Sequence, residues 1–174
     1  MHPFFIIGAM VCSLAYHFSS AQAIIVVKND HKPAEIKQQA AYYAQTLNLD
    51  TNVYILISFS HQVPRNLGGF TRYQDARAEE GGHQIHITIS RKAGRASQMH
   101  TLAHEMVHAQ QFIEGRLVQC DLTHYRWKEQ TCKKVKSMAY LDRPWEKEAS
   151  EVGTRLYNRF REKSRKRLVS FWHN

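Results

Sequence analysis

The residues best suited to chemistry in this chain lie in one pentapeptide, His104-Glu105-Met106-Val107-His108. On an α-helix, residues four positions apart share one face, so the two imidazoles can reach the same metal ion. The glutamate between them then lies beside that metal, where its carboxylate can take a proton from a bound water molecule. The spacing therefore predicts two metal ligands, His104 and His108, and a general base, Glu105.

A third ligand is expected, because a catalytic zinc ion usually has three protein ligands and one position open to water. Two glutamates, Glu146 and Glu148, lie in a later segment with helical periodicity. Glu146 lies on the face of that segment that also carries Ala149, Gly153, Leu156 and Phe160. Glu148 lies on a basic and more polar side. This pattern favours Glu146 as the third ligand and leaves Glu148 as the alternative.

Two helices must position these groups. The first is expected from about Ser97 to Glu114, with Ser97 as its N-terminal cap and Gly115 in a left-handed C-terminal conformation. This helix is apolar over much of its circumference, which is typical of a central helix. Buried histidine and glutamate side chains in such a helix need a partner or a metal ion. The second helix is expected to begin at Pro144 and to end near Lys163.

Together, these motifs resemble a known class of enzymes. The sequence His-Glu-Met-Val-His-Ala-Gln-Gln from His104, followed by Pro-Trp-Glu-x-Glu-Ala from Pro144, is similar to the gluzincin zinc peptidases. It is most similar to small single-domain members with a His-Glu-x-x-His-x-x-Gln helix and a Pro-Trp-Glu-x-Glu-Ala motif. The resemblance covers roughly residues 84–153 and implies one Zn²⁺ per chain and a peptide or protein substrate. It also implies that the segment Gln84–Ser90 is the sheet edge along which zincins align peptides.

In such a site a second donor usually stabilises the oxyanion that forms during attack on a carbonyl group. The candidates for this donor are Tyr140, Tyr157 and His124. His100 lies four residues before His104 on nearly the same helical face. It is expected to be a half-buried polar residue, with support of the metal ligands or ligation itself as alternatives.

The remaining pattern favours an α+β domain over residues 24–174. The expected strands are Ile24–Lys28, Asn52–Phe59, Phe70–Tyr73 and Gln84–Ser90, with a helix from Pro33 to Leu47. Most strand signals precede the two metal-binding helices, whereas an α/β protein would alternate them. We expect a small zincin-like domain, in which a mixed or antiparallel sheet of three or four strands packs on both helices. Residues 116–143 are expected to be mostly loop, with a helical turn or a hairpin.

The N-terminal segment, residues 1–23, is typical of a secretory signal peptide. An uncharged apolar stretch from Phe4 to Tyr16 is followed by Ala21-Gln22-Ala23, a small-x-small pattern that signal peptidases accept. We therefore expect a secreted or periplasmic protein, with an uncleaved membrane anchor as the alternative. The remaining cysteines, Cys120 and Cys132, are then expected to form a disulfide.

Charge suggests a competing interpretation. The chain of 174 residues has a formal net charge of +9, and seven lysines and arginines lie between Arg155 and Arg167. Such a basic tail can bind an anionic polymer or membrane surface, so a secreted binding module without catalysis is the alternative function. The export signal argues against a specific nucleic-acid partner. Nothing in the pattern indicates an oligomeric state.

Overall fold

The computed structural model describes residues 23–49, 52–75 and 82–171, so the predicted signal peptide lies outside the described residues except for Ala23. The main sheet has four strands: β1 (Ile24–Lys28), β2 (Val53–Ser60), β3 (Gly69–Asp75) and β4 (His83–Ser90). Their order is β1-β2-β4-β3, and only β3 is antiparallel to its neighbour. The fold is therefore α+β with a mixed four-stranded sheet, as the sequence predicts.

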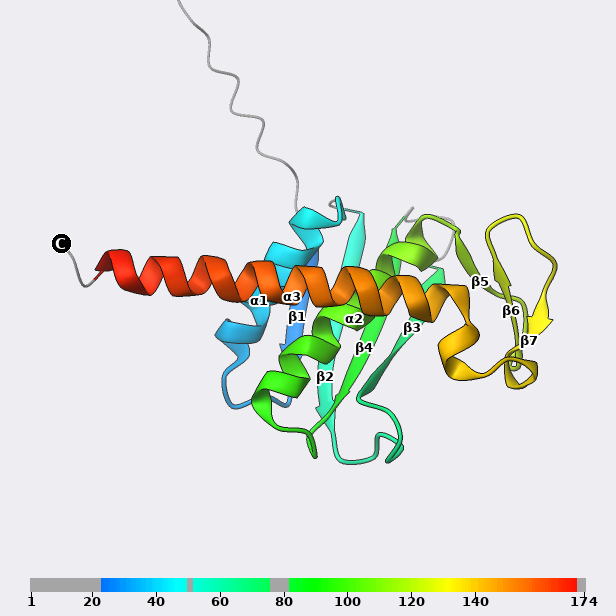
Figure 1. Cartoon of the computed structure of the whole chain (residues 1–174), viewed down its shortest axis with the longest axis horizontal. Coiled ribbons are helices and arrows are strands. Elements are labelled where there is room, and N and C mark those ends of the chain that lie inside the picture. The colour runs from blue at the N-terminus through cyan, green and yellow to red at the C-terminus, as the bar shows by residue number, and fades with distance from the viewer. Residues whose placement is uncertain (1–22, 50–51, 76–81, 172–174) are drawn as a thin grey trace, which may run out of the picture.

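One face of this sheet carries the main core. Alternate residues of the two central strands are fully or almost fully buried: Val53, Ile55, Ile57 and Phe59 in β2, and Ile85, Ile87 and Ile89 in β4. The helices α1 (Pro33–Thr46), α2 (Arg95–Ile113) and α3 (Pro144–Phe171) all lie on this side of the sheet (Figure 1). Apolar side chains at every second position of these strands thus decide which face of the sheet the helices cover.

The edge strand next to the predicted metal-binding helix is β3, not the strand Gln84–Ser90 that the resemblance indicated. That strand corresponds to β4, which pairs with β2 on one side and with β3 on the other. Its alternation of apolar and polar residues reveals a half-buried strand but carries no information about its neighbours. Gly69 and Thr71 of β3 therefore lie next to α2, where the hydroxyl of Thr71 donates a hydrogen bond to Glu105.

The predicted metal-binding helix is α2, which begins at Arg95, two residues before the expected cap. Gly94 is its N-cap residue in an extended conformation, so Ser97 lies in the first turn. At the other end Gly115 has a φ of 66°, which confirms the predicted left-handed terminus. Buried residues occupy several sides of the helix because it lies between the sheet and α3.

The last helix, α3, is longer than predicted and passes across α2 on the side away from the sheet (Figure 1). It continues to Phe171 instead of ending near Lys163, so the basic segment predicted as a tail is helical. After Gly153 it contains neither glycine nor proline, and an ion pair between Glu162 and Lys166, 3.0 Å apart, follows the i,i+4 rule. Within the described ranges, none of the helices has the length and apolar content needed to cross a membrane.

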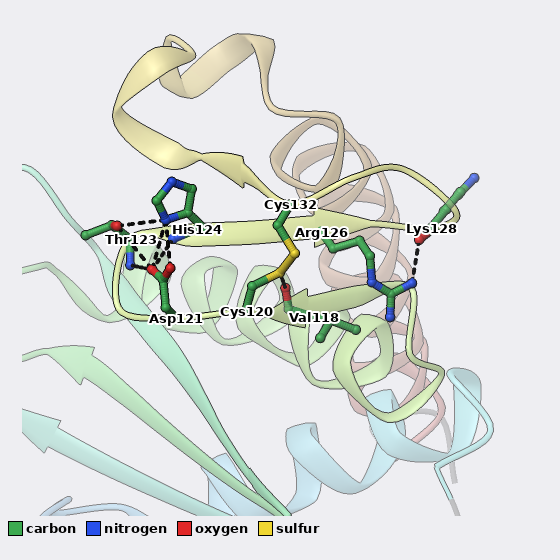
Figure 2. The surroundings of a disulfide bond; sticks show 8 residues. All are labelled: Val118, Cys120, Asp121, Thr123, His124, Arg126, Lys128 and Cys132. Atoms are coloured by element: carbon green, nitrogen blue, oxygen red, sulfur yellow. Dashed lines mark hydrogen bonds and ion pairs between the residues drawn. A yellow bond between two sulfur atoms is a disulfide. The ribbon is translucent and has the colours of Figure 1, made fainter.

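The segment between α2 and α3 contains a second sheet, whereas mostly loop was predicted. Its antiparallel strands are β5 (Leu117–Gln119), β6 (His124–Trp127) and β7 (Lys133–Lys134), followed by the short 3₁₀ helices η1 (Val135–Ser137) and η2 (Tyr140–Asp142). Strands of two to four residues are too short for a clear period of two. The predicted disulfide between Cys120 and Cys132 closes this sheet, as Figure 2 shows.

Candidate metal centre

Three predicted ligand side chains converge on one point between α2 and α3. The distance from Nε2 of His104 to Nε2 of His108 is 3.0 Å, and the two nitrogens lie 3.2 and 3.3 Å from Oε2 of Glu146. A tetrahedral ion with metal–ligand bonds of about 2.0–2.1 Å separates its ligand atoms by roughly 3.3 Å. The ligand set and its spacing therefore fit a single metal ion.

Close packing of the two helices brings the ligands together. Gly153 of α3 lies directly against the backbone of His104, so that an added Cβ would lie 2.9 Å from both the amide nitrogen and the Cα of His104. Ala149, one turn earlier in α3, is fully buried. Both residues are small, and at Gly153 the absence of a side chain lets the two helix backbones come into direct contact. Glu146 lies in the first turn of α3 and so faces the two histidines of α2.

A buried glutamine holds the second histidine in place. Nδ1 of His108 donates a hydrogen bond of 2.8 Å to Oε1 of Gln111, one turn later in α2. That bond fixes the orientation of the ring, so that Nε2 faces the other two ligand atoms. The amide of Gln111 also donates to the carbonyl oxygen of Trp145 at 3.0 Å, so one side chain aligns α2 with the start of α3.

Glu148, the alternative third ligand, lies outside the group of three. Its Oε2 accepts a hydrogen bond of 2.8 Å from Gln111 and a further one from Arg116. Glu148 therefore binds the side chain of Gln111, and of the two glutamates only Glu146 belongs to the group of three.

The carboxylate of Glu105 is enclosed beside the ligand group. The residue is only 4% exposed, and Oε2 accepts a hydrogen bond of 2.7 Å from the hydroxyl of Thr71 on β3. Burial raises the pKa of Glu105 above its usual value, although the nearby His108 and His104 and the Thr71 hydrogen bond act against burial. A carboxylate in such a place has a high affinity for a proton, as a general base requires.

The carboxylate of Glu146 behaves in the opposite way. Burial alone would raise its pKa, but hydrogen bonds from His104, His108 and Tyr140 outweigh burial and hold the pKa well below its usual range. Glu146 is thus ionised at neutral pH, as a metal ligand must be. The two glutamates beside the same pair of histidines are therefore tuned for different tasks.

The ligand group lies in a cavity of about 760 Å³. One wall is formed by β3 and the loop before it, including Gly68 and Thr71, and the other by the small sheet and η2, including Tyr125 and Tyr140. The ligands and Glu105 line the space between these walls. A molecule that fills the cavity would therefore contact the three predicted metal-binding side chains and both sheets.

The oxyanion candidates lie in different places. Tyr140 lines the cavity and donates a hydrogen bond to Glu146, and burial with this bond raises the pKa of Tyr140. Tyr157 packs edge-on against His100, with ring centroids 5.3 Å apart, and is not among the cavity-lining residues. His124 lies on β6 and binds Asp121 at 2.8 Å (Figure 2). Only Tyr140 is therefore placed next to the ligands.

His100 lines the cavity without joining the ligand group. Its Nε2 lies 3.1 Å from Oγ1 of Thr154 on α3, so the ring spans the two helices one turn before His104. Burial and the neighbouring His104 lower the pKa of His100, which favours a neutral ring. This position agrees with the expected half-buried polar residue.

Sequence reasoning missed two side chains that support the site. A single threonine in a short strand carries no signal, so nothing marked Thr71 as the partner of Glu105. Gln111 was part of the motif that carried the resemblance, but the pattern gave it no role. Its signal was available, because a glutamine three residues after His108 lies on the same helical face.

Comparison with protein-family models, curated proteins and solved structures gave no match.

Proposed function

We propose that this protein is an exported zinc-dependent peptidase of the gluzincin type, with a zincin-like fold. One observation carries the proposal: three ligand atoms within 4.8 Å of one another lie beside the enclosed carboxylate of Glu105 in an open cavity. A purely structural metal site is closed by four protein ligands, whereas this group offers three. The remaining position and the adjacent base are what hydrolysis requires.

Zinc is the metal that this donor set suits best, because two imidazoles and one carboxylate are typical of catalytic zinc sites. His104, His108 and Glu146 would hold the ion. When bound, it would lower the pKa of a water molecule to about 7 and polarise a carbonyl group.

The protein side chains would then move the proton and bind the substrate. Glu105 would accept the proton of the attacking water and pass it to the leaving amine. The hydroxyl of Tyr140 lies at Glu146, on the opposite wall from β3, where it can turn from that carboxylate to a developing oxyanion. Thr71 holds the Glu105 carboxylate in place.

An extended peptide is the substrate shape that the cavity favours. β3 is an edge strand of the main sheet within the described residues, and its first half lines the cavity. An edge strand offers free backbone N–H and C=O groups, with which an extended peptide can pair. Export is supported by the disulfide between Cys120 and Cys132, since such bonds persist in oxidising compartments.

The direct test combines metal analysis with hydrolysis. Purified protein is expected to hold about one zinc ion per chain and to cleave peptides from a mixed fluorogenic library. Glu105→Gln is expected to keep the zinc and to lose at least about 100-fold in kcat/KM, because the proton acceptor is removed. His104→Ala is expected to lose the zinc. Zinc-loaded wild type without any hydrolysis would contradict the proposal.

The alternative, a basic binding module, has its own support in the structure. From Arg155 onward, α3 carries six exposed basic side chains: Arg155, Arg159, Arg161, Lys163, Arg165 and Lys166. Metal-free protein that binds vesicles of anionic lipid in a salt-dependent manner, and loses that binding when residues 161–174 are removed, would favour this alternative.

A further inference from the structure

One charged residue in the cavity has no role in the hydrolysis described above. Arg143 lies between η2 and α3 and lines the same cavity as the metal ligands. Its carbonyl oxygen accepts hydrogen bonds of 3.1 Å from the amides of Glu146 and Lys147, which fixes its backbone. Its Nη2 donates to the carbonyl oxygens of Val135 and Met138 at 3.3 and 3.4 Å. The guanidinium group is therefore held in one orientation.

This guanidinium group lacks an acidic partner among the described residues. No carboxylate forms an ion pair with Arg143 there, and its Nε is buried without a hydrogen-bond partner. Arg95 and Arg116 have the same intermediate exposure, yet each binds two carboxylates. A guanidinium always carries its charge and offers donors in a planar fork that matches a carboxylate. Because Nη2 donates to two carbonyl oxygens and Nε is enclosed, the unused capacity of Arg143 for an anion lies at Nη1.

The side chain of Tyr140 lies beside both Arg143 and the predicted metal ligand Glu146. The guanidinium carbon of Arg143 lies 5.4 Å from the ring centroid of Tyr140, whose hydroxyl binds the ligand Glu146. The surrounding segment has the same sign of charge, because residues 116–143 contain seven lysines and arginines and three acidic residues. An anionic ligand would be attracted to this wall of the cavity and would find a fixed cation beside the ligand group.

We propose that Arg143 binds a substrate carboxylate close to the bond that is cleaved. This inference rests on the proposed peptidase function and refines its substrate class. The carboxylate belongs either to the C-terminus of the peptide, which would make the protein a carboxypeptidase, or to an acidic side chain, which would make it an endopeptidase for acidic sequences. Both sources present the same carboxylate group to the guanidinium.

The test measures binding without cleavage. Zinc is removed from the protein with a chelator, the chelator is dialysed away, and peptide binding to the metal-free protein is followed by NMR titration. The probes are acetyl-Ala-Ala-Ala with a free carboxylate, the same peptide as its amide, and acetyl-Ala-Asp-Ala amide. We expect one acidic probe to bind at least about 10-fold tighter than the neutral amide. A tighter free acid identifies the C-terminal carboxylate, and a tighter aspartate peptide identifies the acidic side chain.

Three variants make the result specific. Arg143→Gln is expected to abolish the preference for the acidic probe. Arg143→Lys keeps the charge but not the fork, so part of the preference is expected to remain. Arg126→Gln, a matched charge change on β6 outside the cavity lining, is expected to keep the full preference. Thermal unfolding checks that each variant is folded.

Equal affinity of the wild type for all three probes overturns the inference, as does an equal loss of preference in Arg126→Gln. Because no bond is cleaved and no metal is present, a protein that never hydrolyses peptides can still show the Arg143-dependent preference. A working zinc peptidase can likewise lack it. The two proposals therefore fail independently.

Discussion

Two parts of the cavity lining are built in different ways: the helices that carry the predicted metal ligands, and the wall that contains the small sheet. The side that carries the metal ligands belongs to the main core, in which Ala103 and Met106 of α2 and Ala149 of α3 are fully buried. The wall that contains the small sheet has its own cluster of three buried side chains, Leu117 and Trp127 of that sheet and Trp145 from the first turn of α3. A disulfide joins Cys120, directly after β5, to Cys132, directly before β7 (Figure 2).

This difference matches the demands of the two proposed tasks. Metal ligands must be held to within a fraction of an ångström, and close-packed helices with supporting hydrogen bonds provide such precision. A wall that binds substrate tolerates larger adjustment, so a few apolar contacts and a cross-link are sufficient. Changes at the α2–α3 interface should therefore alter metal affinity, whereas changes in the small sheet should alter substrate binding.

The largest difference is expected between the two glutamates of α3. Glu146→Gln removes the charge and basicity of a ligand, and should weaken zinc affinity at least about 100-fold. Glu148→Gln keeps an oxygen that can accept from Gln111, so its affinity should fall less than about 5-fold. Competition with a zinc-binding dye measures both. Similar losses in the two variants would remove the assignment of Glu146 as the third ligand.

A methyl group at the helix contact should have the next largest effect. In Gly153→Ala the new Cβ would lie 2.9 Å from the backbone of His104, so the helices must move apart. Unfolding free energy should fall by about 2 kcal/mol, although alanine is the better helix former, and zinc affinity should fall about 100-fold.

The matched control is Gly94→Ala, where an added Cβ meets no atom within 4 Å. This variant should change unfolding free energy by less than about 1 kcal/mol and leave zinc affinity unaltered. Denaturant unfolding and dye competition on both variants check the pair. A Gly153→Ala protein as stable as the wild type would show that the helix contact is not tight.

The same contrast explains which features the sequence could predict. The ligands, the helix pair and the central strands follow from periods of 3.6 and two over long segments, and the structure confirms this fold class. The edge position of β3 and the partner of Glu105 depend on strand order, which no local pattern encodes. The small sheet has strands too short for periodicity, and only its two cysteines pointed to the disulfide.

A smaller effect is expected at the glutamine that orients His108. Gln111→Ala removes the acceptor for Nδ1 and the link to Trp145, so zinc affinity should fall about 10-fold to 100-fold. The control is Gln110→Ala, which loses a hydrogen bond to the carbonyl of Leu47 away from the metal ligands. Its zinc affinity should stay within about 2-fold of the wild type. Equal losses would mean that Gln111 acts only through general stability.

The smallest effect on zinc is expected from removing the disulfide. The double variant Cys120→Ser and Cys132→Ser frees a loop closed across 12 positions, which should lower the stability of the small sheet by on the order of 3 kcal/mol. Zinc affinity should change less than about 3-fold, because none of the ligands lies in that sheet. Peptide KM should rise, since Tyr125 and Val135 of the loosened wall line the cavity. Hydrogen exchange of β5 and β6, measured beside dye competition, separates the two responses. If zinc affinity fell together with the protection of these strands, the two walls would form one cooperative unit, and the ligand geometry would depend on the cross-link as much as on helix packing.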